Sequence, residues 1–255
     1  METTSLLSGG KHYDLLVDWK KRLSLEIPFL TEFLQKHPHI QTILEVGCGT
    51  GRHAEILHKN LGYQITGIDI EKTMIEEAKK RLPGAEMLSH DFLDQKILKG
   101  RSFDAIISLG NSIGLMASKK NFGEIIIRFS QLLKKPGGLL IFHLLNTSKE
   151  RHGWSTPRSI ITLEGEFIFL RGFSTTRKFI HPEILTLYKP KNGDKWEMSS
   201  TGKANIPRIN QKEMTALLKK SDFTNIKVFG DYQRKLFNPS SSIDMIYVCE
   251  ANSQF

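Results

Sequence analysis

The sequence predicts an α/β protein: a mostly parallel sheet covered by helices on both faces, with a small antiparallel β lobe inserted after the fifth strand. Strand-length apolar runs alternate with helix-period segments over Thr42–Leu145, which is typical of such sheets. After residue 150, short β-like runs follow one another without an intervening helix, and the alternation resumes at Asn210. The predicted core therefore comprises residues 1–150 and 209–255, and the predicted lobe comprises residues 151–208.

The core elements are predicted from the spacing of apolar residues. Short apolar runs indicate five buried strands over 42–46, 64–70, 86–89, 103–109 and 139–145. Helices are expected over 20–36, 71–82 and 122–133, and a further helix should begin near Arg52. Asn210 and Glu213 resemble a capping box that opens a helix to Lys220. Two more strands, over 225–230 and 243–250, bring the sheet to seven strands.

The lobe is predicted from three β-like segments, 166–173, 184–188 and 195–199. The turn Lys191-Asn192-Gly193-Asp194 is a hairpin signal, because Asn-Gly favours the tight turns that join antiparallel strands. Since no helix-period segment separates these runs, they are expected to form an antiparallel sheet.

The composition is that of a globular protein, with 39% hydrophobic and 25% charged residues among 255. No apolar run approaches the roughly 20 residues of a membrane span, and residues 1–14 lack the order of a secretory signal. The two cysteines, Cys48 and Cys249, cannot form a disulfide framework. We therefore expect a soluble, cytoplasmic protein with no membrane partner and no metal site.

The net charge of +9 raises the question of nucleic-acid binding. The lobe carries ten Lys/Arg residues and five Asp/Glu residues. These basic residues are scattered between apolar ones, which is typical of a solvated basic face. The pattern therefore disfavours nucleic acid as the partner, without removing it from the alternatives.

A glycine loop follows the first predicted strand, and its sequence is Glu45-Val46-Gly47-Cys48-Gly49-Thr50-Gly51. Glycines allow the backbone to approach a bulky ligand closely before a helix starts. The G-x-G-x-G spacing differs from the G-x-G-x-x-G of dinucleotide sites. Glu45 would repel a pyrophosphate, whereas it can bind the cationic α-amino group of S-adenosylmethionine (SAM).

Two acidic residues follow later strands. Asp69 ends the second strand, 18 residues beyond Gly51, where its side chain can accept hydrogen bonds from both ribose hydroxyls. Asp91 and Phe92 follow the third strand, and they offer a carboxylate for the adenine amino group and an apolar wall for the ring. A carboxylate that merely caps the next helix is the alternative at Asp69.

These segments, together with the turn Leu133–Gly138, resemble class I SAM-dependent methyltransferases over 42–145 and 209–251. The resemblance implies a Rossmann-like seven-stranded sheet, SAM as the cofactor and S-adenosylhomocysteine (SAH) as the product. It also places Ile70, Met74 and Leu109 around the adenosine and sulfonium. The predicted cofactor-binding residues of the loop and the later strands are Glu45, Gly47, Cys48, Gly49, Gly51, Asp69, Ile70, Met74, Asp91, Phe92 and Leu109.

Within this family the chain is most similar to small-molecule N-methyltransferases that act on glycine, sarcosine or nucleotide-linked amino sugars. Ser108–Gly114 resembles their loop after the fourth strand, the lobe resembles their substrate cover, and Val228–Tyr232 resembles a late motif. The resemblance of the N-terminal segment implies that Tyr13 lies near the transferred methyl group and that Arg22 binds the methionine carboxylate.

Two departures from these relatives concern the acceptor. Leu115 stands where they often have a histidine, and Leu144-Leu145 stand where the glycine enzymes have an arginine for the substrate carboxylate. Glycine is therefore disfavoured as the acceptor. For the removal of one proton from the acceptor, His143 is a candidate base, and Asn111 could orient the acceptor amine or the cofactor.

The function predicted is methyl transfer from SAM to a nitrogen of a small-molecule acceptor. The alternatives are a small-molecule O-methyltransferase, an RNA methyltransferase and a catalytically silent SAM-binding protein. The segment Leu109–Ser112 is not the Asn/Asp-Pro-Pro-Tyr/Phe of enzymes that methylate base amino groups. The lobe could cover the site of its own subunit or pack against a second copy in a homo-oligomer.

Overall fold

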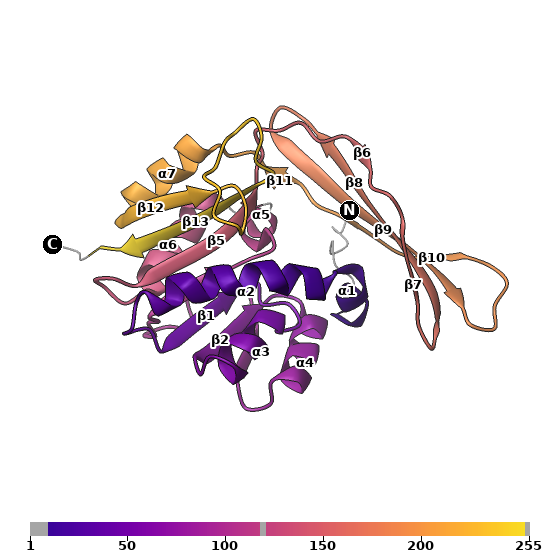
Figure 1. The fold of residues 1–255 in the computed structure, drawn as a ribbon, viewed down its shortest axis with the longest axis horizontal. Helices are drawn as coiled ribbons and strands as arrows, with labels where there is room; N and C mark the ends of the chain where they lie inside the picture. Colours follow the sequence, from indigo (N-terminus) through magenta and orange to yellow (C-terminus); the bar gives the residue numbers. More distant parts are fainter. Residues whose placement is uncertain (1–9, 118–120, 253–255) are drawn as a thin grey trace.

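The core is built on a seven-stranded sheet. The computed structural model describes residues 10–117 and 121–252. The strand order is β12-β13-β5-β4-β1-β2-β3 (Figure 1). These strands are β1 (Thr42–Val46), β2 (Gln64–Asp69), β3 (Glu86–Ser89), β4 (Ala105–Ser108), β5 (Leu139–Leu145), β12 (Phe223–Phe229) and β13 (Asp244–Ala251). Strands β1 to β5 pair in parallel, whereas β13 is antiparallel to β5 and β12, so the predicted sheet is confirmed.

Helices cover both faces of this sheet. One apolar cluster joins the sheet to α2 (Trp19–Gln35), α3 (Arg52–Lys59) and α4 (Lys72–Arg81). A second cluster joins it to α5 (Ser112–Met116), α6 (Phe122–Leu132) and α7 (Gln211–Lys220). Ile43 lies in the first cluster and Leu44 in the second, because successive side chains of a strand point to opposite faces. Glu45 therefore points to the face covered by α2 and α3.

A short helix, α1 (Gly10–Leu16), lies between the core and the lobe. The carboxylate of Asp14 accepts hydrogen bonds from Thr50 Oγ1 (2.6 Å), Arg52 (2.7 and 3.1 Å) and Arg81 (2.7 Å). On the other side, the carbonyl of Leu16 accepts hydrogen bonds from two lobe arginines. These contacts fix α1 beside the glycine loop.

The lobe is a second, antiparallel sheet with the order β10-β9-β8-β6, and it projects to one side of the core (Figure 1). β7 pairs with β8, and β11 pairs with β9. The turn predicted at 191–194 lies between β9 and β10, which pair antiparallel. The lobe strands are β6 (Gly153–Trp154), β7 (Arg158–Ile161), β8 (Gly165–Thr175), β9 (Phe179–Pro190), β10 (Glu197–Lys203) and β11 (Ile206–Pro207).

Five short elements were absent from the sequence prediction: α1, α5, β6, β7 and β11. The predicted capping box of α7 is confirmed, because the Asn210 side chain accepts from the Glu213 N–H and the Glu213 side chain accepts from the Asn210 N–H. Within the part of the chain that the structure describes, no helix has the length and apolar character needed to cross a membrane.

Gly47 has no room for a side chain, and its replacement by alanine should be costly. Its φ is +71°, and a Cβ there would lie 2.5 Å from the Cβ of Ser112 in α5. Gly62 has a similar φ of +76° with nothing within 4 Å of a Cβ. We expect Gly62→Ala to lower the free energy of unfolding by about 1 kcal/mol and Gly47→Ala by about 3 kcal/mol, measured by urea denaturation. Equal losses would contradict the close contact between the glycine loop and α5.

Candidate active site

The loops after β1 and β4 meet at the carboxyl edge of the sheet. β1 and β4 are neighbours, and the strand order reverses between them, which in open α/β sheets creates a crevice for ligands. Gly47, Gly49 and Gly51 have φ values of 71°, 54° and 75°. The backbone N–H of Gly47 donates to the carbonyl of Ile68 in β2 (2.8 Å), so the loop is held at the ends of both strands.

Asp69 ends β2 beside this loop. Its Oδ2 accepts a hydrogen bond from the Gly49 N–H (2.9 Å), and its Oδ1 accepts one from the Glu71 N–H (3.0 Å). Burial raises the pKa of the Asp69 carboxyl, and these two donors oppose the shift. The next side chain, Ile70, is 53% exposed, whereas the thiol of Cys48 is buried. A carboxylate beside an open apolar side chain suits a ribose and an adenine ring, and both predicted roles stand as proposals.

The other residues predicted to surround the adenosine lie deeper or serve local structure. Met74 and Leu109 are 1% and 4% exposed. Phe92 packs in the core with its ring centroid 5.2 Å from that of Phe129 in α6. The carboxylate of Asp91 accepts a hydrogen bond from the backbone two residues further on. Phe92 thus packs against α6 and Asp91 holds a turn, and their predicted roles at the adenine ring stand as proposals.

Glu45 belongs to a buried network of charged side chains. Its Oε1 lies 3.3 Å from Nδ1 of His53 in α3, and Nε2 of His53 lies 2.5 Å from Oε2 of Glu26 in α2. Both oxygens of Glu26 also accept hydrogen bonds from Nε of Arg22, at 3.0 and 2.9 Å. The second oxygen of Glu45, Oε2, is buried and has no hydrogen-bond partner among the described residues. A ligand with a cationic amino group could satisfy it.

This network makes the stability of the protein depend on pH. Burial alone would lower the pKa of His53, but the hydrogen bonds and charges of Glu26 and Glu45 raise it to about 9. Burial alone would raise the pKa of Glu26, but His53 and Arg22 lower it to about 2. The charged His53 therefore stabilises the fold fully below the pKa of a free histidine, about 6.5, and this contribution is lost as the pH rises through 9.

We expect the wild type to be more stable than His53→Gln, and we expect this difference in free energy of unfolding to depend on pH. The difference should be larger at pH 6.5 than at pH 9.5, by an amount on the order of 3 kcal/mol. The measurement is urea denaturation of both proteins across that range. His58→Gln serves as the control, because His58 lies on the same helix but is exposed. A wild-type advantage that does not change with pH would show that His53 is neutral in the folded protein.

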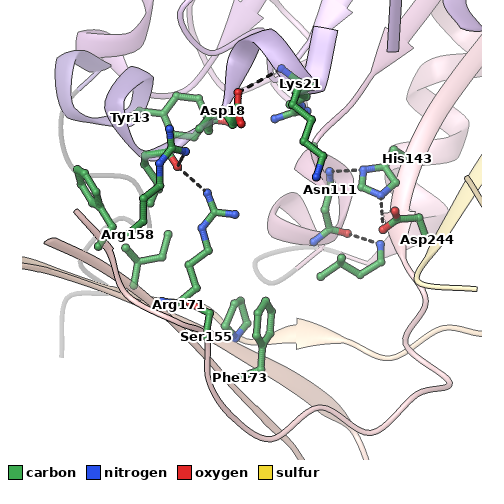
Figure 2. A pocket seen from close by; sticks show the side chains of 18 of the residues that line it. Tyr13, Asp18, Lys21, Asn111, His143, Ser155, Arg158, Arg171, Phe173 and Asp244 are labelled. Atoms are coloured by element: carbon green, nitrogen blue, oxygen red, sulfur yellow. Dashed lines mark hydrogen bonds and ion pairs between the residues drawn. The ribbon is translucent and has the colours of Figure 1, made fainter. Parts of the chain in front are cut away.

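A cavity of about 650 Å³ separates the core from the lobe. Its walls come from α1 and α2, from the ends of β4, β5 and β13, and from β8 and β9 of the lobe. Figure 2 shows Tyr13, Arg158 and Arg171 on one side, with Asn111, His143 and Asp244 on the other. We call this space the lobe cavity. The cavity is lined by all three residues that were predicted from the sequence to act in catalysis: Tyr13, Asn111 and His143.

His143 uses both ring nitrogens in contacts with the protein. Its Nδ1 accepts a hydrogen bond from the backbone N–H of Asn111 (3.1 Å), so the ring proton lies on Nε2. Nε2 is 3.0 Å from Oδ1 of Asp244 (Figure 2), and it makes no hydrogen bond among the described residues. The Asn111 side chain accepts from the N–H of Leu145 (3.0 Å). The Nδ1 lone pair of His143 is therefore engaged, whereas the Asp244 side chain is 26% exposed and also lines the cavity.

Tyr13 lies between the glycine loop and the lobe cavity. Its Cε1 is 3.8 Å from the place of a Cβ on Gly49, and its ring meets Trp19 edge-on with centroids 5.9 Å apart. Burial raises the pKa of the Tyr13 phenol, and the nearby Arg22 opposes the shift. Arg22 also lines the cavity, under Gly110. The phenol thus faces both the loop and the cavity in its protonated form.

A family model described as a methyltransferase domain matches residues 43–138. This range includes β1 to β4, the glycine loop and Asp69. The chain carries a methyltransferase domain. The predicted fold class is confirmed, and the predicted family is supported as a methyltransferase domain over residues 43–138.

Two curated proteins similar to this chain are N-methyltransferases by name, and the first of them is matched over less than half of its own length. The chain is 33% identical over 104 residues to dTDP-3-amino-3,4,6-trideoxy-alpha-D-glucopyranose N,N-dimethyltransferase of Streptomyces venezuelae, a match over 41% of this chain and 42% of that enzyme. It is 24% identical to glycine/sarcosine N-methyltransferase of Parasynechococcus marenigrum, over 95% of this chain and 83% of that enzyme. The sugar N-methyltransferase KedS8 from Streptoalloteichus sp shares its fold, with a TM-score of 0.77, 17% identity and coverage of 94% and 93%.

Sequence reasoning missed several side chains of the methyltransferase site. Glu26 and His53 are in contact although they are 27 residues apart in the sequence. Asp244 and His143 are in contact because they lie on neighbouring strands, β13 and β5, that are distant in sequence. Arg171 reaches α1 from the lobe. The Glu26 position carried a usable signal, because an acidic residue on the apolar stripe of a helix must find a buried partner. The other pairings required the tertiary structure.

Proposed function

We propose that this chain transfers the methyl group of SAM to a nitrogen atom of a small molecule bound in the lobe cavity. The observation that carries the proposal is the position of Tyr13, whose ring lies beside the glycine loop, 3.8 Å from the place of a Cβ on Gly49, and also lines the cavity. Tyr13 thus borders both the glycine loop and the lobe cavity. This proximity is required for methyl transfer, because the methyl donor and the acceptor atom must lie next to each other. The names of the two curated relatives support nitrogen as the acceptor atom.

The residues present fit SAM. The unpartnered buried oxygen of Glu45 suits its ammonium, Arg22 suits its carboxylate and Asp69 suits its ribose hydroxyls. When bound, SAM would supply a methyl group on a cationic sulfur, and the acceptor nitrogen would bond to that methyl carbon as the carbon–sulfur bond breaks and SAH leaves. The chain's own contribution is to bind, orient and exclude water.

The protein must also receive a proton, because an amine that arrives as an ammonium ion has no lone pair to attack with. Asp244 lines the lobe cavity, and its side chain is 26% exposed. We assign it the role of proton acceptor. His143 lies beside this carboxylate, with Nε2 3.0 Å from Oδ1, and the backbone N–H of Asn111 holds the His143 ring through Nδ1. The sequence-based assignment of His143 as the base is thereby replaced by a positioning role for that ring.

The size of the lobe cavity supports a small-molecule acceptor. The cavity volume of about 650 Å³ lies within the usual range of small-molecule sites, roughly 300–1,000 Å³. Apolar side chains of the lobe, among them Phe169 and Phe173, line the cavity opposite the core. They would shield the reacting atoms from water.

The test is SAH release from SAM in the presence of separate pools of primary and secondary amines, hydroxyl compounds and transfer RNA. The proposal predicts release with the amine pool and a mass increase of about 14 Da on the amine that reacts. Turnover confined to the hydroxyl pool would assign an O-methyltransferase, and turnover confined to RNA would make the basic lobe a nucleic-acid surface. Either result would overturn the proposed acceptor while leaving the cofactor assignment standing.

A further inference from the structure

The buried network of Glu45, His53, Glu26 and Arg22 contains a residue with no role in the function proposed so far. His53 lies in the first turn of α3 and is 4% exposed. It is therefore shielded from solvent, and it does not line the lobe cavity. It lies between two carboxylates, with Nε2 2.5 Å from Glu26 and Nδ1 3.3 Å from Glu45. A histidine enclosed in this way is costly to bury unless its charge is used.

The geometry of Glu45 shows what that charge does. His53 occupies Oε1 of Glu45, while Oε2 is buried without a partner among the described residues. A carboxylate held at one oxygen is fixed in orientation, and the other oxygen is left for a donor. The same imidazole also fixes Glu26, whose two oxygens hold Nε of Arg22. The NH2 group of Arg22 lies 2.9 Å from the place of a Cβ on Gly110, beside the loop after β4.

We propose that His53 is a positioning residue that orients Glu45 and Arg22 together, so that one buried network sets the site for the amino-acid end of SAM. The inference rests on the proposed function, since it concerns how this chain recognises the cofactor. His53 itself does not touch the ligand. Its replacement should therefore impair recognition of the ammonium and carboxylate and spare recognition of the adenosine, which depends on Asp69 and Ile70 at the other side of the loop.

Two ligands separate these ends of the cofactor. SAH carries the full amino-acid end, and 5′-methylthioadenosine carries the adenosine and the sulfur without it. Calorimetric titration of both ligands into His53→Gln should show SAH affinity reduced about 10- to 100-fold, the effect of one charge-assisted hydrogen bond, and methylthioadenosine affinity changed less than about threefold. His58→Gln, the same substitution at an exposed site on α3, should leave both affinities unchanged.

A purely structural role for His53 predicts that both affinities fall together, and that result would overturn the inference. Equal and undiminished affinities in the variant would overturn it as well. If wild-type protein binds neither ligand, the proposed function fails instead, so the two failures are distinguishable.

A readout on the wild type covers the case in which His53→Gln does not fold. Nitrogen-15 spectra of the imidazole rings at pH 7 should show a doubly protonated histidine whose signals shift on addition of SAH and remain in place on addition of methylthioadenosine. Signals that respond equally to the two ligands, or to neither, would contradict the coupling of His53 to the amino-acid end.

Discussion

Asp69→Ala should abolish measurable binding of SAH, with an expected loss of affinity of at least 100-fold. The Asp69 carboxylate is the acceptor assigned to the two ribose hydroxyls, and each charge-assisted hydrogen bond contributes a factor of about 10 to 100. The substitution also removes the acceptor for the Gly49 N–H, so the glycine loop loses one of its hydrogen bonds to β2. Equilibrium dialysis with labelled SAH measures the loss.

The control for this variant is Asp94→Ala. Asp94 is exposed, and its carboxylate accepts a hydrogen bond from the N–H two residues on, as that of Asp69 does from Glu71. This variant should bind SAH with wild-type affinity. Retention of binding by Asp69→Ala would mean that the carboxylate only caps the turn before α4, which is the alternative that the sequence left open.

The second large effect is expected on turnover. Asp244→Asn keeps the size of the side chain and removes its ability to take a proton, so kcat should fall by about 100- to 10,000-fold once an acceptor amine is known. SAH affinity should change less than about threefold, because Asp244 lies at the cavity and outside the glycine loop. Steady-state kinetics with separate kcat and KM values, together with SAH titration, measure both quantities.

Glu250→Gln is the matched control for Asp244→Asn. Glu250 lies on the same strand, β13, and its carboxylate also meets a histidine, with Oε1 3.3 Å from Nε2 of His37. This pair does not line the lobe cavity. We expect unchanged kcat in this variant. A similar fall in both variants would indicate a general effect on β13 and would contradict the proton-acceptor role of Asp244.

The sequence predicted the elements whose pattern is set by burial on the sheet. The bounds of β1, β3 and β5 were predicted to the residue, because an apolar run between polar turns leaves little choice of register. The start of α7 was predicted from the chemistry of Asn210 and Glu213, which is local. In contrast, α5 was expected as a loop. It has five residues, and its N-cap Asn111 has a φ of +64°, so its conformation depends on contacts with β5.

The candidate site divides in the same way. The glycine loop and Asp69 follow from local spacing along one βαβ unit, and sequence reasoning could find them. Glu45 contacts His53 of α3, which in turn contacts Glu26 of α2, and His143 contacts Asp244 of β13. No local sequence pattern pairs these residues. The packing of Phe92 against α6 is a further contact between distant segments that no local pattern predicts.

The most direct test of the account is calorimetric titration of SAM into the wild-type protein. The account predicts binding of about one SAM per chain, displaced by SAH, with no metal added. Saturable binding would show that the methyltransferase domain binds its cofactor, and it would justify the search for the acceptor amine. Absence of heat and of any SAH competition at millimolar ligand would contradict the central claim, because the glycine loop, Asp69 and Glu45 would then hold no cofactor.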